Sequence, residues 1–214
     1  MTGSSETGRF AERATPVAPA DERTQMFDEF AWVGSDLYTS GAVSSHGGNL
    51  SVRLDGDRML ITRTGSMIGR LTAADLIETS LTSCGDPHDP ECSVELVVHR
   101  AIYAATGARA IVHAHAVETV ARSLVEDLIV PVDSESKARL IDVPVVATEQ
   151  TIGSAEAGAK LADVLKHRRV AVLRSHGPFA VGETLEDAYQ AVSCLEASCR
   201  VLNILDAIGR VPRT

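Results

Sequence analysis

Two histidines separated by a single residue have the spacing of metal ligands. His113 and His115 flank Ala114 in an apolar run with β-strand character, so we expect both side chains to project from one face and chelate one ion. His176 follows a later apolar run and precedes Gly177, which lets the backbone approach a ligand closely. Three neutral nitrogen ligands with an acid nearby are typical of a catalytic zinc site that keeps one position open.

Glu95 can supply the acid for such a site. The pattern predicts a helix over residues 93–105 with Ser93 as its cap, which places Glu95 and His99 on one helix face. Both observations also have structural explanations, because an acid in the first turn is favoured by the helix dipole and a lone His-x-His pair is often half buried and hydrogen-bonded. The position of His176 in a loop after a strand favours the metal interpretation.

Two loops have the composition of an anion site. Gly47-Gly48-Asn49 precedes a predicted strand, and residues 62–66, which include Arg63, Thr64 and Gly65, follow the strand paired with it. Backbone N–H groups, hydroxyls and the Arg63 guanidinium can together cradle a phosphate or a carboxylate. Ser93, at a helix start, adds a third possible contact. Ordinary turn and capping chemistry explains the same residue types, so each loop alone is weak evidence.

Composition limits the class of protein. The chain has 214 residues, 44% of them hydrophobic and 23% charged, which is typical of one globular domain, here residues 21–214, preceded by a disordered tail over residues 1–20. A net charge of -9 argues against a nucleic-acid partner but leaves room for a small anionic substrate. Four cysteines without metal-type spacing and no secretory signal favour a cytoplasmic protein, and no apolar run is long enough for a membrane span.

The periodicity of apolar residues predicts a mixture of helices and strands. A helix is expected from residue 21 to just before Gly41, and a hairpin over residues 49–54 and 58–62 turns at Asp55-Gly56-Asp57. Further strands are expected over residues 76–81, 110–115, 128–132, 143–147 and 169–174, and further helices over 117–125, 154–167 and from Thr184 onward. Strict alternation is absent, so we predict a three-layer α/β/α fold around a mostly antiparallel central sheet.

Five short motifs occur in a fixed order within residues 21–209. They are Gly48-Asn49-Leu50-Ser51-Val52-Arg53, Thr62-x-Thr64-Gly65, Ser93-x-Glu95 with His99, His113-Ala114-His115 and Ser175-His176-Gly177-x-x-Ala180. The combination resembles the class II aldolase and adducin-head family, and within it the fuculose-phosphate aldolase branch.

The resemblance implies a homotetrameric Zn²⁺ enzyme, with Mn²⁺ or Co²⁺ as alternatives, whose active sites lie at subunit interfaces. The implied reaction is retro-aldol cleavage of a ketose 1-phosphate to dihydroxyacetone phosphate and an aldehyde. Carried over by position, the zinc ligands are His113, His115 and His176, and Glu95 is the catalytic acid/base. The implied phosphate ligands are Gly48, Asn49, Thr64, Gly65 and Ser93.

Two departures from the family pattern concern proton and phosphate handling. Val94 follows Ser93 where the family often has a second hydroxyl, and Arg63 can supply compensating charge. The family also uses tyrosines from a neighbouring subunit as proton donors, and none of the three tyrosines here falls at those positions. Near the position of one of the family tyrosines, this chain has Glu135. A carboxylic acid there can donate a proton if burial raises its pKa.

Three alternatives remain open. The weakened phosphate loop and Arg63 also suit a metal-dependent decarboxylase of a hydroxylated aromatic acid, such as a dihydroxyphthalate, or of an oxo-acid phosphate. An adducin-like interaction module would keep the fold without catalysis, although the intact histidine set argues against it. L-ribulose-phosphate 4-epimerases share the same kind of site.

Overall fold

The computed structural model describes residues 22–212. The tail predicted for residues 1–20 lies outside this range, as do residues 21, 213 and 214.

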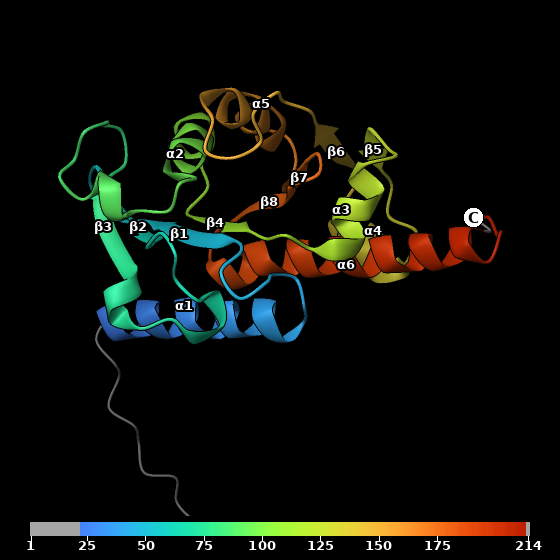
Figure 1. Ribbon diagram of the computed structural model, residues 1–214, viewed down its shortest axis with the longest axis horizontal. Helices are drawn as coiled ribbons and strands as arrows, with labels where there is room; N and C mark the ends of the chain where they lie inside the picture. Colours follow the sequence, from blue (N-terminus) through green and yellow to red (C-terminus); the bar gives the residue numbers. More distant parts are fainter. Residues whose placement is uncertain (1–21, 213–214) are drawn as a thin grey trace, which may run out of the picture.

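A single sheet of eight strands forms the centre of the protein (Figure 1). The strand order is β3-β2-β1-β4-β8-β7-β6-β5, and among the described residues all neighbouring strands are antiparallel except β6 and β7. The strands are β1 (Asn49–Arg53), β2 (Arg58–Thr62), β3 (Leu76–Ser80), β4 (Ala110–His113), β5 (Leu128–Ile129), β6 (Val143–Val146), β7 (Val170–Leu173) and β8 (Gly177–Gly182). The mostly antiparallel sheet predicted from the sequence is confirmed.

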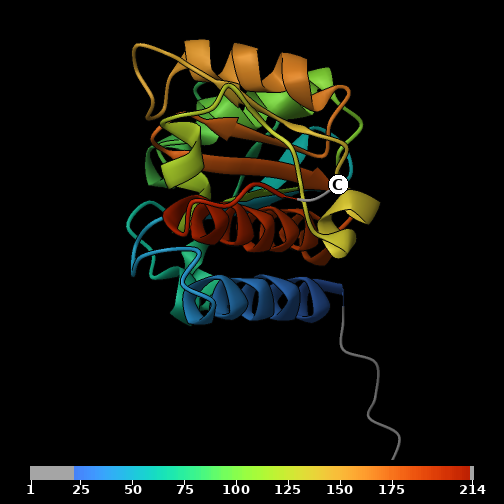
Figure 2. The same cartoon turned by 90° about the vertical axis from the view of Figure 1, so that its right-hand side faces the viewer.

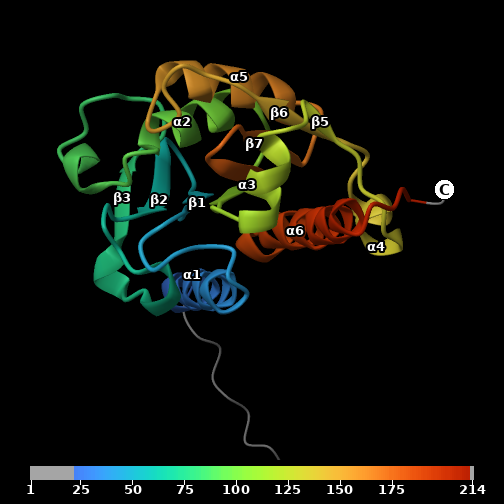
Figure 3. The same ribbon diagram turned by 45° about the vertical axis from the view of Figure 1, so that its right-hand side comes forward.

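Helices cover both faces of this sheet, which gives three layers (Figure 2). On one face lie α2 (Leu96–Ala105) and α5 (Ala155–Leu165), which pack against each other. On the other face lie α1 (Glu22–Thr39) and α6 (Leu185–Ala207). Two short helices, α3 (Val117–Ser123) and α4 (Ser134–Arg139), pack against α6 (Figure 3). The predicted α/β/α architecture is therefore confirmed.

Strand β4 is buried on both of its faces. Val112 faces the hydrophobic cluster beneath α1 and α6, whereas Ile111 faces the cluster beneath α2 and α5, as the alternation of strand side chains requires. Burial on both faces explains why this strand reads as a continuous apolar run. It also gives His113, the last residue of β4, a rigid support.

Local capping signals predicted the starts of α5 and α6 correctly. The hydroxyl of Ser154 accepts a hydrogen bond from the Ala157 N–H at 3.0 Å, and the hydroxyl of Thr184 accepts one from the Asp187 N–H at 3.1 Å. Among residues 22–212, no helix combines the length and the apolar character that a membrane crossing requires.

The central strand β8 was missed because its sequence contains Gly177 and Pro178, which are typical of loops. In the structure, Pro178 lacks an N–H to donate, but its carbonyl accepts a hydrogen bond from the Ala114 N–H at 3.1 Å. The next residue, Phe179, is fully buried and lies opposite His113 across the sheet. The short helix α4 was also missed, since the sequence placed no element between residues 132 and 143.

Candidate active site

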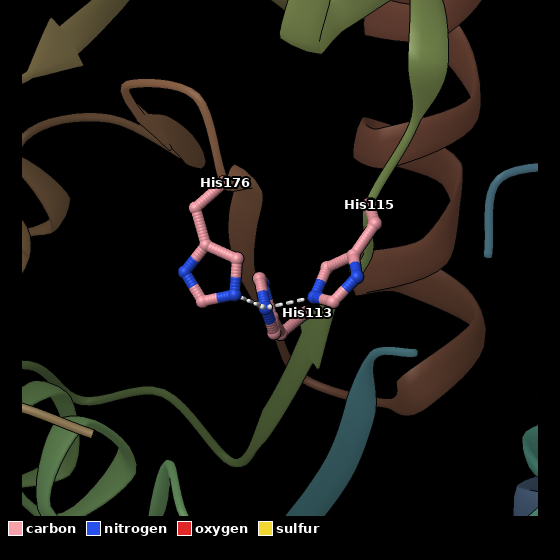
Figure 4. A group of neighbouring side chains, drawn as sticks. All are labelled: His113, His115 and His176. Carbon is pink, nitrogen blue, oxygen red and sulfur yellow. Dashed lines mark hydrogen bonds between the residues drawn. The ribbon is translucent and has the colours of Figure 1, made fainter. Parts of the chain in front are cut away.

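The three histidines converge at one end of the central strands. His113 ends β4, His115 follows two residues later, and His176 lies in the turn between β7 and β8. The Nε2 atom of His113 lies 3.1 Å from that of His115 and 3.3 Å from that of His176. Figure 4 shows the three rings turned toward a common centre. One ligand atom from each ring lies within 4.8 Å of the others, so the group can hold one metal ion.

One detail of the histidine prediction was wrong. The strand was expected to run through both His113 and His115, but β4 ends at His113, and the His115 N–H donates to the Ala42 carbonyl at 3.0 Å instead of continuing the ladder. The predicted strand was therefore two residues too long.

Backbone carbonyls orient two of the rings. Nδ1 of His113 lies 3.0 Å from the Pro178 carbonyl oxygen, and Nδ1 of His176 lies 2.7 Å from that of Thr151. A carbonyl oxygen only accepts, so both Nδ1 atoms carry the proton and both Nε2 atoms present a lone pair. Phe179 stacks on the His113 ring with 3.8 Å between centroids, which further restricts that ring.

The electrostatics of the site favour neutral imidazoles. Burial, together with His176 and His115, holds the pKa of His113 well below 6.5. Burial and the nearby His176 lower the pKa of His115 to about 4, and burial lowers the pKa of His176. Three unprotonated nitrogens that face one another fit a divalent cation, because metal ligands must be deprotonated and imidazole suits zinc in particular.

Glu95 is buried beside this group, with 2% of its surface exposed. Its Oε1 accepts a hydrogen bond from the Gly153 N–H at 3.1 Å and lies 3.9 Å from Nε2 of His176, while Oε2 has no partner among the described residues. Burial raises the pKa of Glu95 to about 7, although the Gly153 hydrogen bond opposes the shift. A carboxyl group with such a pKa can both accept and release a proton near neutrality.

The helix after Glu95 starts later than predicted. α2 begins at Leu96, and the hydroxyl of Ser93 accepts a hydrogen bond from the Glu95 N–H at 3.3 Å instead of capping the helix. His99 does not accompany Glu95 into the site, because it is fully buried with its Nε2 bonded to Asn49.

All six predicted anion ligands share one cavity with the histidines and Glu95. The cavity has a volume of ≈ 220 Å³. Its lining includes Gly48, Asn49, Arg63, Thr64, Gly65 and Ser93 together with Glu95, His113, His115 and His176. These residues come from segments up to 128 positions apart in the chain, between Gly48 and His176.

Arg63 and Thr64 are already partly engaged. The Arg63 guanidinium forms an ion pair with Glu91 and donates from Nε to the Ala74 carbonyl at 3.0 Å. The Thr64 N–H donates to the Glu91 carbonyl at 3.0 Å, so Thr64 offers a ligand its hydroxyl rather than its backbone N–H. Because Glu91 already neutralises part of the Arg63 charge, Arg63 compensates less than expected for the hydroxyl missing at Val94.

Several residues of the site were not anticipated from the sequence. His46 and Ile152 also line the cavity, and the loop at Thr151 and Gly153 holds His176 and Glu95 through backbone atoms. His46 stands just before Gly47-Gly48-Asn49 and was recognisable by its type. The loop contributes backbone groups, which residue identities do not reveal.

Glu135 is not brought to the histidines within the chain. It belongs to α4 and lines a different cavity of ≈ 630 Å³, together with Glu29 and Trp32 of α1 and Tyr189 of α6. A role for Glu135 at the histidine site therefore requires another copy of the chain.

Comparisons with known proteins agree with this architecture. Residues 28–203 match the family described as the Class II Aldolase and Adducin N-terminal domain. The solved structure of L-fuculose-1-phosphate aldolase from Thermus thermophilus superimposes with a TM-score of 0.83 and 38% identity, and the match covers 89% of this chain and 100% of that one.

Two relatives carry different activities in their names. The 3-oxo-tetronate 4-phosphate decarboxylase of Pectobacterium atrosepticum is 31% identical over 185 residues, which cover 83% of each chain. The methylthioribulose-1-phosphate dehydratase of Acidiphilium cryptum is 29% identical, over 86% of this chain and 92% of its own length. This chain therefore belongs to the class II aldolase and adducin family, and it resembles the fuculose-phosphate aldolase branch of that family.

Proposed function

We propose that this chain is a metal-dependent lyase that cleaves a carbon–carbon bond of a small phosphorylated substrate. The observation that carries the proposal is the composition of one cavity, in which three converging neutral histidines, a buried acid with a pKa of about 7 and a set of anion donors lie together. The relatives described above support a phosphorylated substrate, since each of their names contains a sugar or sugar-acid phosphate.

His113, His115 and His176 would hold the ion. Zn²⁺ is the proposed occupant because three imidazole nitrogens with an open position match its catalytic sites, while Mn²⁺ and Co²⁺ are alternatives. When bound, the ion supplies Lewis acidity that stabilises negative charge on a substrate oxygen.

The phosphate would bind in the same cavity, against Gly48, Asn49, Thr64, Gly65 and Ser93, with Arg63 as a further contact. Hydroxyl, amide and backbone N–H donors suit an anion in a partly enclosed space. A phosphate held there leaves the rest of a small substrate within reach of Glu95 and the histidines, because all of them line the same ≈ 220 Å³ cavity.

The first candidate reaction is retro-aldol cleavage of a ketose 1-phosphate to dihydroxyacetone phosphate and an aldehyde. The electron pair of the broken bond remains on the dihydroxyacetone phosphate carbon, which must then receive a proton. Glu95 would deliver that proton. The substrate hydroxyl that becomes the aldehyde must lose its proton, and Glu135 contributed by a neighbouring subunit is our proposed group for this step.

Decarboxylation of an oxo-acid phosphate is the second candidate. Glu95 is the one carboxyl group among the described residues that line the cavity. Loss of carbon dioxide leaves the electron pair on carbon and requires a single proton to be delivered there, which Glu95 alone can provide. Retro-aldol cleavage requires a second proton-transfer group, and among residues 22–212 the cavity of one chain offers no second carboxyl group for it, only His46 apart from the proposed metal ligands.

We also propose a homotetramer with sites at subunit interfaces. Glu135 and the histidines lie at different cavities of one chain, so the part proposed for Glu135 requires a neighbouring subunit. Exposed apolar residues near the end of α6, Val201, Ile204 and Ile208, add surface that an interface can bury.

An assay of zinc-loaded protein against ketose 1-phosphates and oxo-acid phosphates tests the proposed reaction, with aldehyde and carbon dioxide followed together. Dihydroxyacetone phosphate plus an aldehyde supports the aldolase. Carbon dioxide without an aldehyde supports the decarboxylase. Stoichiometric zinc without turnover of either class would contradict the lyase proposal and favour a binding role.

A further inference from the structure

A buried chain of hydrogen bonds lies behind the cavity, between β1 and α2. Nε2 of His99 lies 2.5 Å from Oδ1 of Asn49, and Nδ1 of His99 lies 2.6 Å from the Ser51 hydroxyl. That hydroxyl lies 2.9 Å from the Tyr103 hydroxyl. Asn49 and Ser51 are two residues apart on a strand, and His99 and Tyr103 are four apart on a helix, so each pair presents its side chains on one face.

The chemistry of the end groups gives the chain a direction. Oδ1 of Asn49 only accepts, so Nε2 of His99 must donate its proton to it. A neutral imidazole then has an unprotonated Nδ1, which accepts from the Ser51 hydroxyl, and Ser51 in turn accepts from Tyr103. Burial lowers the pKa of His99 to about 3 and raises the pKa of Tyr103. Both side chains are therefore neutral, with one proton on the imidazole and one on the tyrosine hydroxyl.

This direction determines which end of the Asn49 amide is available to a ligand. With Oδ1 bonded to His99, the amide nitrogen is the atom left to serve the cavity, which Asn49 lines beside Gly48 and Ser93. Asn49 also lies opposite His113 in the β1–β4 ladder, so its amide is close to the metal ligands. A flipped amide would place its NH₂ group against the Nε2–H of His99 and an acceptor oxygen against a bound anion.

We propose that His99 is a positioning residue that fixes the Asn49 side chain with its N–H donors toward a bound anion. The proposal rests on the anion pocket proposed above. His99 itself lines no part of that cavity and acts only through Asn49.

A matched pair of substitutions tests this role in the full-length, zinc-loaded protein, with inorganic phosphate as the probe in isothermal titration calorimetry. His99→Gln keeps a donor near the position of Nε2, whereas His99→Met has a similar length and none. We expect His99→Met to weaken phosphate binding about tenfold, which corresponds to the loss of one hydrogen bond to a charged ligand. His99→Gln should weaken it by about threefold or less.

The same pair in an Asn49→Ala background is the decisive control. If His99 acts through Asn49, the difference between Gln and Met disappears there, because the amide to be oriented is absent. A difference that persists in this background would overturn the proposal while leaving the anion pocket intact. If the zinc-loaded wild-type protein binds no phosphate, the anion pocket itself is wrong, and this proposal falls with it.

Two further measurements exclude a purely structural effect. His99 also contacts Phe179 edge-on, with 6.3 Å between centroids, and Phe179 stacks on His113, so zinc content is measured in each variant. Unchanged zinc with weakened phosphate binding supports action through Asn49, and parallel loss of both would contradict it. Ser51→Ala, which removes the donor to Nδ1, offers a second test if His99→Met does not fold, and should weaken phosphate binding only when Asn49 is present.

Discussion

Glu95 is the residue whose chemistry depends most on its surroundings. Replacing it with Gln keeps the size of the side chain but removes its capacity to transfer a proton. We expect Glu95→Gln to retain stoichiometric metal and to lose turnover by about 10²- to 10⁴-fold. Glu183→Gln makes the same change on an exposed side chain and should leave the rate unaltered. Metal analysis alongside steady-state kinetics checks this, and full activity in Glu95→Gln would rule out the proposed role.

The raised pKa of Glu95 also predicts a pH dependence of stability in metal-free protein. The folded-state pKa is about 7 and the ordinary value is 4.5, so the protonated form is favoured by folding. The contribution of Glu95 to the free energy of unfolding is fully present below pH 4.5 and is lost as the pH rises through 7. Above pH 7, metal-free Glu95→Gln should therefore be more stable than wild type by about 3 kcal/mol.

Urea unfolding of chelator-treated wild type and Glu95→Gln between pH 4.5 and 8 measures this difference. Since both proteins contain the same histidines, their contribution cancels in the comparison. A difference that stays constant over the range would show that Glu95 has an ordinary pKa.

The histidines form the second residue-scale prediction. His176→Ala should lose the bound metal and all turnover, because two nitrogen ligands hold a divalent ion far less tightly than three. His167→Ala removes an exposed histidine and serves as the control. The depressed pKa values of the ligands, about 4 for His115, predict that wild type keeps its metal on dialysis at pH 5.5, where ordinary histidines are protonated. Metal content after dialysis measures both effects.

At the scale of elements, the turn into β1 brings the anion loop against β4. Gly48 has φ +78°, and a Cβ at this position would lie 2.7 Å from the His113 carbonyl oxygen and 2.8 Å from Cγ1 of Val43. Gly56 has a similar φ of +71°, but its Cβ would meet open space. The two positions therefore separate the cost of left-handed backbone from the cost of crowding.

We expect Gly56→Ala to lower the free energy of unfolding by about 1–2 kcal/mol, the cost of the left-handed conformation alone. Gly48→Ala should cost about 1–3 kcal/mol more, because it adds a clash with the β4 backbone. Urea denaturation of both variants provides the comparison. Equal losses would mean that the loop moves freely away from β4.

Elements whose signals are local were predicted well. The hairpin of β1 and β2 follows from its Asp-Gly turn, and α5 and α6 begin at their capping residues. β8 was missed because its Gly177 and Pro178 oppose strand formation locally. It is a strand because its neighbours β4 and β7 supply the pairing from both sides, and because Phe179 is buried between the helices and His113.

At the scale of the whole molecule, the separation of Glu135 from the histidines makes the assembly testable. If Glu135 acts in the site of a neighbouring subunit, each site takes Glu95 from one chain and Glu135 from the other. A site formed by one Glu95→Gln chain and one Glu135→Gln chain can then contain both intact residues. Co-expression of the two inactive variants should then restore about a quarter of wild-type activity, since random assembly pairs two intact contributions at that frequency.

Co-expression of Glu95→Gln with His176→Ala is the matched control. Both of these residues line one cavity of the same chain, so no mixed assembly contains an intact site and no recovery is expected. Light scattering reports whether the protein is tetrameric. Full activity of Glu135→Gln alone would show that Glu135 has no catalytic part, and absence of recovery in the mixture would show that Glu135 does not act in the site of a neighbouring subunit.

By itself, the sequence determined the available chemistry and the architecture: three histidines in metal-ligand spacing, an acid beside them, glycine- and hydroxyl-rich loops, and a three-layer fold. Residue type, short-range spacing and apolar periodicity carry this information. Only the tertiary structure decided that Glu95 is buried with a pKa of about 7, that His99 turns to Asn49, and that Glu135 lies at another cavity. Each of these depends on packing between segments distant in sequence, which no local pattern encodes.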